Sequence, residues 1–261
     1  MTLLATDISN YSGEISAQQA RDLWAAGVRK VIVQIVNERV LTHRQQIPVL
    51  LAQGFEVEAY VYVWFSGGEE WVKQRVAWAC RELSAFPLVS MLWLDCEQSL
   101  KDDPPFDHVN GQTTDIIRAA VDVVTHAGYR TGIYTARWWW GPGTNNSTAF
   151  SHLPLWSANY DQDPDRDPAN YGGWGVPDME QYQGSTTLAG VPMVDLNVYE
   201  PTEAPSLPQP LPGGEFLPEP DESDAAAFYR AAMLGPQPDS EIIAIPPERV
   251  GWAYWKFGVK Q

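Results

Sequence analysis

Two acidic side chains end an apolar run in the middle of the chain. The segment MLWLDCEQ, residues 91–98, is typical of a buried strand, and it finishes with Asp95 and Glu97. Residues two apart on a strand point to the same side, so both carboxylates are expected to face one end of the sheet. Acids occur near the ends of two further strand-like runs, Asp7 in LLATDIS and Asp195 in PMVDLNVY.

Four carboxylates at one site would repel one another and lose water, and both effects raise the pKa of at least one of them. A carboxyl group with a raised pKa is a general acid near neutral pH, and glycoside hydrolysis is the reaction that most often uses such a set. A lone D-x-E is most often a solvated turn, but acids at three predicted strand ends favour function. A divalent-metal site is the alternative, less favoured because the surroundings are aromatic and no histidine lies at ligand spacing.

The order of strand-like and helix-like runs predicts how these acids are brought together. The runs alternate up to residue 136, which indicates parallel strands joined by helical crossovers. The strand-like runs cover residues 3–9, 30–36, 56–65, 88–97 and 131–136, and the helix-like runs cover 16–27, 44–54, 70–86 and 111–128. Three further strand-like runs, at 153–161, 178–184 and 192–200, have only loops between them.

These runs predict an α/β fold, an irregular TIM-like barrel with eight strands and reduced helices in its second half. In such a barrel the C-terminal strand ends carry the active site, which is where the acids would lie. An open doubly wound sheet is the alternative, but no Gly-rich phosphate loop follows the first strand.

The predicted barrel spans residues 1–200. A Pro-rich linker at 201–222 follows it, and its composition excludes the interior of a helix or sheet. Residues 223–261 are too few for a core of their own. We therefore expect this C-terminal extension to pack on the barrel or on a partner, through self-association or within a virion.

The composition argues against several classes of partner. A net charge of -16 disfavours nucleic acid and anionic membrane surfaces, whose phosphates are held mainly by Lys and Arg. No apolar stretch approaches the roughly 20 residues that span a bilayer, and no basic region precedes an apolar segment at the N-terminus. Neither membrane insertion nor a signal peptide is expected. Cys80 and Cys96 are too few for a disulfide framework and are expected to be buried thiols.

Aromatic residues near the predicted strand ends indicate a groove for a glycan. Each alone is more typical of core packing, but as a ring around one mouth their faces could stack on sugars. Gln181 and Asn197 are expected either to bind hydroxyl or acetamido groups or to have a structural role. Of the three tryptophans at 138–140, one or two are expected to be exposed in a loop, because adjacent side chains diverge. The candidate aromatic residues are Tyr62, Trp64, Tyr134, Trp156 and Tyr160.

Several segments together resemble the successive motifs of glycoside hydrolase family 25, the lysozyme-like muramidases of bacteria, phages and fungi. The resemblance covers roughly residues 3–200. Its opening D-x-S-x-x-x-G, its D-x-E and its closing V-D-L-N-V-Y are strong together and weak singly. The segments are TDISNYSGEIS, MLWLDCEQ, TGIYTARWWW, PLWSANYD and EQYQGSTTLAGVPMVDLNVYE.

The resemblance implies an irregular α/β barrel with fewer helices than strands, and a hydrolase that uses no cofactor or metal. The substrate would be the glycan strand of peptidoglycan, cleaved at the β-1,4 bond between N-acetylmuramic acid and N-acetylglucosamine. Glu97 would be the acid/base, with Asp95, Asp7 and Asp195 as its partner carboxylates. Asp95 would steady an oxazolinium-like intermediate, or a carboxylate would act more directly on the sugar, and both routes stay open.

The resemblance is incomplete at one position. The family often has a histidine in its third strand where this chain has Val61, which predicts a missing hydrogen bond or electrostatic contact and an altered substrate preference. The alternative function is a glycan-binding or structural component of a phage particle. The expected location is the host cytoplasm and then the cell wall, reached through a holin, or a virion.

Overall fold

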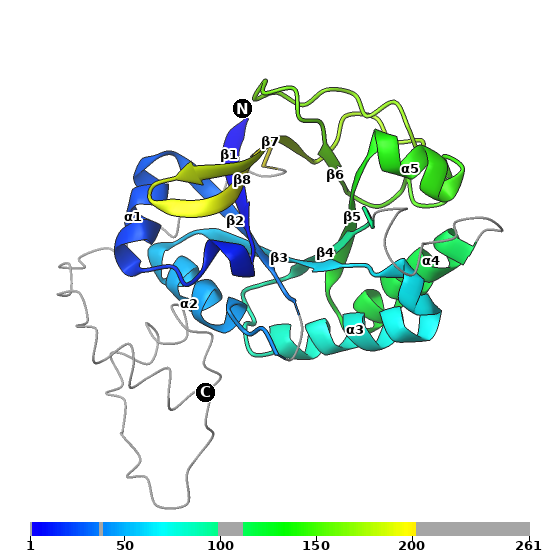
Figure 1. Cartoon of the computed structure of the whole chain (residues 1–261), viewed down its shortest axis with the longest axis horizontal. Helices are drawn as coiled ribbons and strands as arrows, with labels where there is room; N and C mark the ends of the chain where they lie inside the picture. The colour runs from blue at the N-terminus through cyan, green and yellow to red at the C-terminus, as the bar shows by residue number, and fades with distance from the viewer. Residues whose placement is uncertain (1, 37–38, 99–111, 202–261) are drawn as a thin grey trace, which may run out of the picture. The chain divides into compact units, whose positions relative to one another are not determined.

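Eight strands form a closed barrel, in which each strand pairs with its neighbours in sequence and the last pairs with the first (Figure 1). The computed structural model describes residues 2–36, 39–98 and 112–201. The predicted eight-stranded α/β barrel is confirmed, whereas the predicted linker and C-terminal extension lie outside the described residues. The strands are β1 (Leu3–Ile8), β2 (Val28–Gln34), β3 (Glu56–Tyr62), β4 (Met91–Asp95), β5 (Arg130–Ala136), β6 (Leu155–Ala158), β7 (Met179–Leu188) and β8 (Val191–Tyr199).

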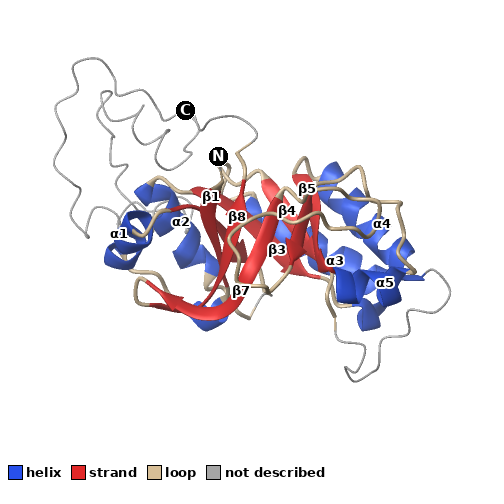
Figure 2. Ribbon diagram, turned by 90° about the horizontal axis from the view of Figure 1, so that it is seen from above, coloured by secondary structure: helices blue, strands red, loops and turns tan. Residues whose placement is uncertain are grey.

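Helices cover the barrel unevenly. Figure 2 shows α1 and α2 on one flank and α3, α4 and α5 on the other. No helix separates β6, β7 and β8, so the predicted reduction of helices in the second half is confirmed. The helices are α1 (Ala17–Ala25), α2 (His43–Gln53), α3 (Gly68–Leu83), α4 (Gln112–His126) and α5 (Arg137–Thr144), with 3-10 turns η1 (Asn10–Ser12) and η2 (Phe65–Gly67).

The direction of β8 differs from that of the other strands. β1 to β7 pair in parallel, whereas β8 is antiparallel to both β7 and β1. The β7–β8 hairpin turns at Ala189 and Gly190, which both have positive φ (52° and 73°), as two-residue hairpin turns require. Asp195 lies in the middle of β8 rather than at a strand end. It pairs in register with Asp7, near the end of β1, and so reaches the same end of the barrel.

Alternate residues of the strands face two different layers. One cluster of buried side chains, which includes Ile32, Tyr60, Trp93 and Trp156, fills the barrel. Large rings here require a small neighbour, because a Cβ on Gly132 would lie 2.4 Å from the ring of Trp93. A second cluster lies between the strands and the helices.

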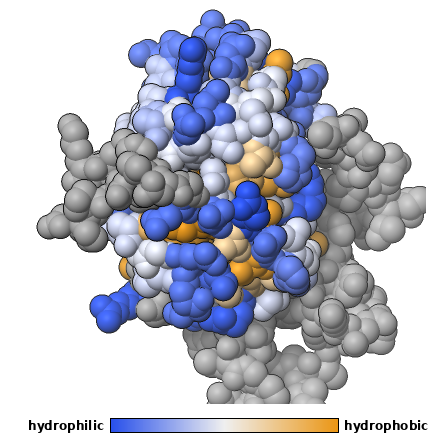
Figure 3. All heavy atoms as spheres, turned by 90° about the vertical axis from the view of Figure 1, so that its right-hand side faces the viewer, coloured by the Kyte–Doolittle hydropathy of each residue, from blue (hydrophilic) through white to orange (hydrophobic). Residues whose placement is uncertain are grey.

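Both cysteines are buried in this outer layer as free thiols, which confirms the expectation for Cys80 and Cys96. The surface on the α4 and α5 side is mostly hydrophilic, with patches of apolar residues between hydrophilic ones (Figure 3). Within the described part of the chain, no helix is long and apolar enough to cross a bilayer.

Candidate active site

Asp95 and Glu97 project from the same strand into the end of the barrel that we call the mouth, where the parallel strands finish. Asp95 is the last residue of β4, and the strand pairing continues beyond it because the Cys96 N–H donates to the carbonyl of Tyr134 at 2.8 Å. Cys96 is fully buried in the outer layer, so its neighbours on either side face the interior. The alternation predicted from the sequence therefore holds.

The backbone after Glu97 is held by two neighbouring segments. The indole of Trp139 donates to the carbonyl oxygen of Gln98 at 2.7 Å. The Ser66 N–H donates to the Gln98 side chain at 3.0 Å, and that side chain donates to the Ser66 hydroxyl at 2.8 Å. One of the three adjacent tryptophans thus fixes the position of the D-x-E segment.

Two neutral amides hold the aspartates on the other side of the mouth. Asp7 Oδ2 accepts hydrogen bonds from Gln181 Nε2 at 2.9 Å and Asn197 Nδ2 at 2.8 Å. Gln181 Nε2 also lies 3.2 Å from Asp195 Oδ2, and the Ser185 N–H donates to Asp195 Oδ1 at 2.5 Å. Asp7 and Asp195 are therefore surrounded by uncharged donors.

The same two amides, Gln181 and Asn197, have partners for both their oxygen and their nitrogen. Gln181 Oε1 accepts from the hydroxyls of Tyr134 at 2.7 Å and Tyr160 at 2.8 Å. Asn197 Oδ1 accepts from the indole of Trp156 at 2.8 Å. Gln181, Asn197 and Trp156 are at most 1% exposed. This burial favours the structural alternative for both amides, and the expectation that Trp156 stacks on sugars is wrong because its ring lies inside the barrel.

Burial and mutual repulsion raise the pKa values of the acids at the mouth. For Asp7, burial first and then the charge of Asp195 raise the pKa to about 8, although two amide donors oppose this. For Glu97, burial and the charge of Asp195 raise the pKa to about 7, opposed by the hydroxyl of Tyr134. Burial also raises the pKa of Asp195. The four carboxylates cannot all be ionised at neutral pH, so the mouth holds at least one proton.

Asp95 differs from the other three acids in its hydrogen bonding. It is 4% exposed, and its Oδ1 has no hydrogen-bond partner among the described residues. Burial, followed by the charges of Glu97 and Asp7, raises its pKa well above the usual value. An unpartnered buried oxygen is costly, so this atom is available to a ligand group that enters the mouth.

Exposed aromatic rings follow the ends of several strands. Tyr62 is the last residue of β3 and Trp64 follows it; their ring centroids lie 5.8 Å apart, and Trp64 is 37% exposed. Tyr160, after β6, is 50% exposed, whereas Tyr134 is buried and offers only its hydroxyl. The predicted ring of aromatics is thus present in part.

Two further exposed aromatics were not among the candidate aromatic residues, although one or two of the tryptophans at 138–140 were expected to be exposed. Tyr11, after β1, is 74% exposed, and Trp138, after β5, is 60% exposed. Both directly follow strands whose C-terminal ends form the mouth, which is the signal that would have found them. The expected loop at 138–140 is instead the first turn of α5, with Trp138 exposed and Trp139 and Trp140 buried.

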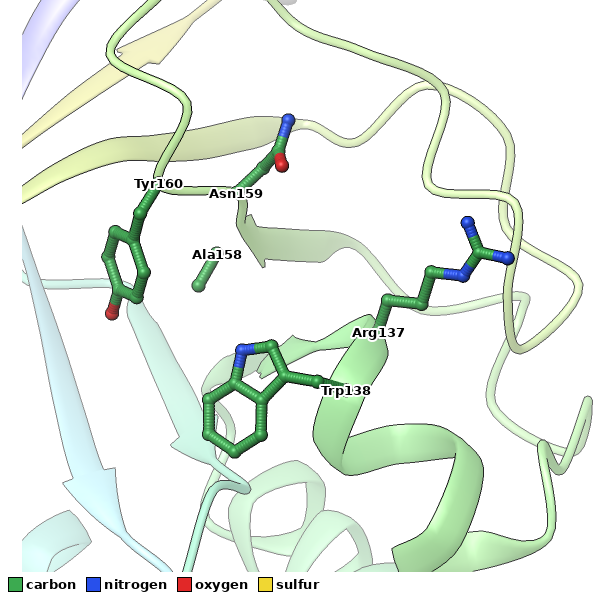
Figure 4. A pocket seen from close by; sticks show the side chains of 5 residues that line it. All are labelled: Arg137, Trp138, Ala158, Asn159 and Tyr160. Carbon is green, nitrogen blue, oxygen red and sulfur yellow. The ribbon is translucent and has the colours of Figure 1, made fainter.

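A cavity of about 450 Å³ lies beside the mouth, lined by Arg137, Trp138, Ala158, Asn159 and Tyr160 (Figure 4). Ala158 lies between the rings of Trp138 and Tyr160, and Arg137 extends on the far side from Tyr160. The hydroxyl of Tyr160 bonds to Gln181, so this ring belongs to both the cavity and the carboxylate network.

The position of the family histidine lies outside the mouth. Val61 is fully buried in the layer between strands and helices, and its neighbours Tyr60 and Tyr62 alternate to the other side. Val61 therefore faces the helices, and the altered substrate preference expected from it stays a prediction. Within the described ranges, no group of three or more His, Cys, Asp or Glu side chains could hold a metal ion.

The fold and the acidic mouth together define a barrel glycoside hydrolase, and comparison with known proteins gives the family. The sequence profile of Glycosyl hydrolases family 25 matches residues 6–191. The chain belongs to this family.

Relatives and solved structures agree with that assignment. Probable GH family 25 lysozyme 3 of Dictyostelium discoideum is 34% identical over 108 residues, which are 41% of this chain and 22% of that protein. The chain covers less than half the length of each curated relative it matches.

Among solved structures, the bacterial lysozyme from Streptomyces coelicolor is similar with a TM-score of 0.61 and 16% identity, covering 76% of this chain and 92% of that one. The modular Cpl-1 endolysin complexed with a peptidoglycan analogue is similar with a TM-score of 0.52 and 19% identity, covering 75% of this chain and 53% of that one. At these identities the structures support the fold.

Proposed function

We propose that this chain is a peptidoglycan N-acetylmuramidase that cleaves the β-1,4 bond between N-acetylmuramic acid and N-acetylglucosamine. The observation that carries the proposal is a partly exposed Glu97 with a pKa raised to about 7, beside three further carboxylates at the barrel mouth. Family membership and the likeness to lysozymes support it. The peptidoglycan analogue held by the Cpl-1 endolysin supports the substrate class.

Glu97 is the proposed general acid. A pKa near neutrality keeps a share of this carboxyl protonated at pH 7, so it can give its proton to the glycosidic oxygen as the bond to the anomeric carbon breaks. The resulting carboxylate then takes a proton from the water that attacks the anomeric carbon. The hydroxyl of Tyr134 acts to lower the pKa of Glu97 and so favours the carboxylate that forms after proton transfer.

Asp95 is the proposed electrostatic partner of the reacting sugar. Its unpartnered Oδ1 could accept the N–H of the substrate acetamido group, which would turn the acetamido oxygen toward the anomeric carbon. A direct role of a carboxylate on the sugar is the second route. Asp7 and Asp195 fit it less well, because Asp7 Oδ2 already accepts from Gln181 and Asn197, and both oxygens of Asp195 accept from Gln181 and Ser185.

The test is release of reducing ends from purified peptidoglycan by the wild type and by Glu97→Gln, with the new terminal sugar identified by mass spectrometry. We expect muramic-acid ends from the wild type and a loss on the order of a hundredfold or more in the variant, because a glutamine has no proton to give.

The control is Glu70→Gln, the same change on the exposed first turn of α3, which should leave the rate unchanged. Equal inactivity of the wild type and Glu97→Gln on several wall types would contradict the proposal. The barrel would then be treated as a glycan-binding or structural component.

A further inference from the structure

The cavity beside the mouth joins two kinds of surface. Trp138 and Tyr160 are 60% and 50% exposed, and Ala158 between them has only a small side chain (Figure 4). Aromatic faces bind the apolar C–H faces of sugar rings, whose hydroxyls then point sideways. This part of the cavity therefore suits one sugar unit of a glycan.

The cavity adjoins the carboxylates through Tyr160. Burial raises the pKa of Tyr160 to about 12, and the charges of Glu97, Asp195 and Asp7 add to that rise. Its hydroxyl also lies 3.3 Å from that of Tyr134, which acts to lower the pKa of Glu97. A sugar against Tyr160 would be a near neighbour of the bond at Glu97.

Arg137 forms the opposite end of the same cavity. It is exposed, and it makes no ion pair with any residue that the structure describes. The chain has 33 acidic and 17 basic residues. An arginine without an ion pair to any described residue is therefore unusual here, in a cavity next to four carboxylates. A ligand carboxylate would be repelled from the mouth and attracted to Arg137.

The neighbouring asparagine is already oriented. Asn159 Nδ2 donates to Asp161 at 2.9 Å and to Glu180 at 3.2 Å, and Figure 4 shows its nitrogen directed away from Ala158. The carbonyl oxygen is thereby left on the side of the cavity, where it can accept a hydrogen bond from a sugar hydroxyl or amide.

We infer that this cavity is a subsite for a sugar that carries a carboxylate on a short arm, with Trp138 and Tyr160 against the ring and Arg137 paired with the carboxylate. The inference rests on the proposed function and names the residue that selects a muramic-acid unit over an unsubstituted N-acetylglucosamine. The carboxylate has two possible sources, the lactyl group itself or the peptide attached to it, and the same cation would recognise either.

The test measures binding by titration calorimetry to the Glu97→Gln protein, which removes the proposed proton donor. The probes are glycan tetrasaccharides with free lactyl carboxylates, the same glycans with those carboxyls converted to amides, and glycans that keep the stem peptide. Wild-type Arg137 should favour the free carboxylate over the amide about fivefold, as expected for a partly exposed ion pair, and less at high salt.

Arg137→Gln should abolish that preference, and Arg137→Lys should restore part of it. The matched control is Arg130→Gln, which removes the same charge from an exposed arginine at the opposite end of β5. Equal binding of the acid and amide glycans, or equal weakening of both by Arg137→Gln, would overturn the inference. A preference confined to the peptide-bearing glycan would assign the carboxylate to the peptide.

Failure of the proposed function gives a different result. Arg137-dependent binding without hydrolysis by the protein that retains Glu97 would refute the muramidase and keep the subsite. Hydrolysis of acid and amide glycans at equal kcat/KM would keep the muramidase and refute the subsite.

Discussion

The two ends of the barrel interior both hold buried acids, but the groups that contact those acids differ between the ends. At the base, near the start of the strands, Lys30 Nζ lies 2.6 Å from Glu58 and 3.1 Å from Glu56. The indole of Trp93 donates to Glu58 at 2.5 Å, and Lys30 lies 4.4 Å from the centroid of the Tyr199 ring. At the mouth, the carboxylates face amides, hydroxyls and backbone N–H groups, and no described cation pairs with them.

The difference separates a structural solution from a reactive one. Pairing with a buried lysine offsets the charge of an acid and links neighbouring strands. An acid among neutral donors keeps a raised pKa and can exchange a proton, although its burial opposes folding when it is ionised. The predictions below alter one end and use the other as the reference, from the largest expected effect to the smallest.

Removing the cation at the base of the barrel, Lys30, should lower the stability of the protein and leave its catalytic rate unchanged. Lys30→Met leaves Glu58 buried and unpaired, which should lower the free energy of unfolding by about 3 kcal/mol. Urea unfolding measures this, and kcat of the folded protein should stay near that of the wild type. Lys73→Met, a change on the exposed face of α3, should alter stability little. A large loss of kcat with normal stability would instead show that Lys30 belongs to the catalytic machinery.

The rate should depend on the protonation of Glu97. Because its pKa is about 7 and the acid form is reactive, kcat/KM should fall about tenfold per pH unit well above pH 7. Tyr134→Phe removes the hydroxyl that favours the carboxylate of Glu97, so the decline should move to higher pH. Tyr199→Phe, at the base of the barrel, should leave the pH of this decline unchanged. A rate that stays level up to pH 9 would exclude Glu97 as the acid.

Gln181 should act as a positioning residue for both aspartates. Gln181→Met removes the donors to Asp7 and Asp195 and the acceptor for two tyrosines. We expect kcat to fall about tenfold with little change in KM, because the amide is buried and unavailable to substrate. A rise in KM alone would indicate that Gln181 binds the glycan, as the sequence allowed. The pH profile should also shift, which a purely structural role would not cause.

Stability should decrease as pH rises. The pKa of Asp7 is about 8 in the folded protein and close to 4 in the unfolded chain, so the folded state binds more protons between these values. The stabilisation is complete below the unfolded pKa and is lost as pH rises through the folded pKa. The midpoint temperature of thermal unfolding should therefore be higher at pH 5 than at pH 8. Asp7→Asn should reduce this difference, and a midpoint that increases from pH 5 to pH 8 would contradict the assignment.

Several features could be read from the sequence because they depend on neighbours along the chain. The alternation of Asp95, Cys96 and Glu97 follows from strand geometry and holds beyond the assigned end of β4. The alternation of strand-like and helix-like runs gave the barrel and the loss of helices after β6. The burial of both thiols followed from their number and their apolar surroundings.

Other features depend on partners far apart in the chain and could not be read from it. Asp195 was placed at the mouth for the wrong reason, because only the antiparallel direction of β8 brings this mid-strand residue opposite Asp7. The sequence predicted that the ring of Trp156 stacks on a sugar, but closure of the barrel places this ring in the interior. Gln181 and Asn197 could not be assigned, because their partners are more than 20 residues away for most of their hydrogen bonds.

The sequence by itself determined the acids, their local direction on each strand and the family of the barrel, since each follows from patterns within a few residues. The tertiary structure alone decided which acids are desolvated together, which amides hold them and which aromatics stay exposed. It also placed Arg137 in a cavity next to Tyr160. These properties arise from closing the barrel, because pKa shifts and ligand cavities depend on distances and burial that sequence spacing does not encode.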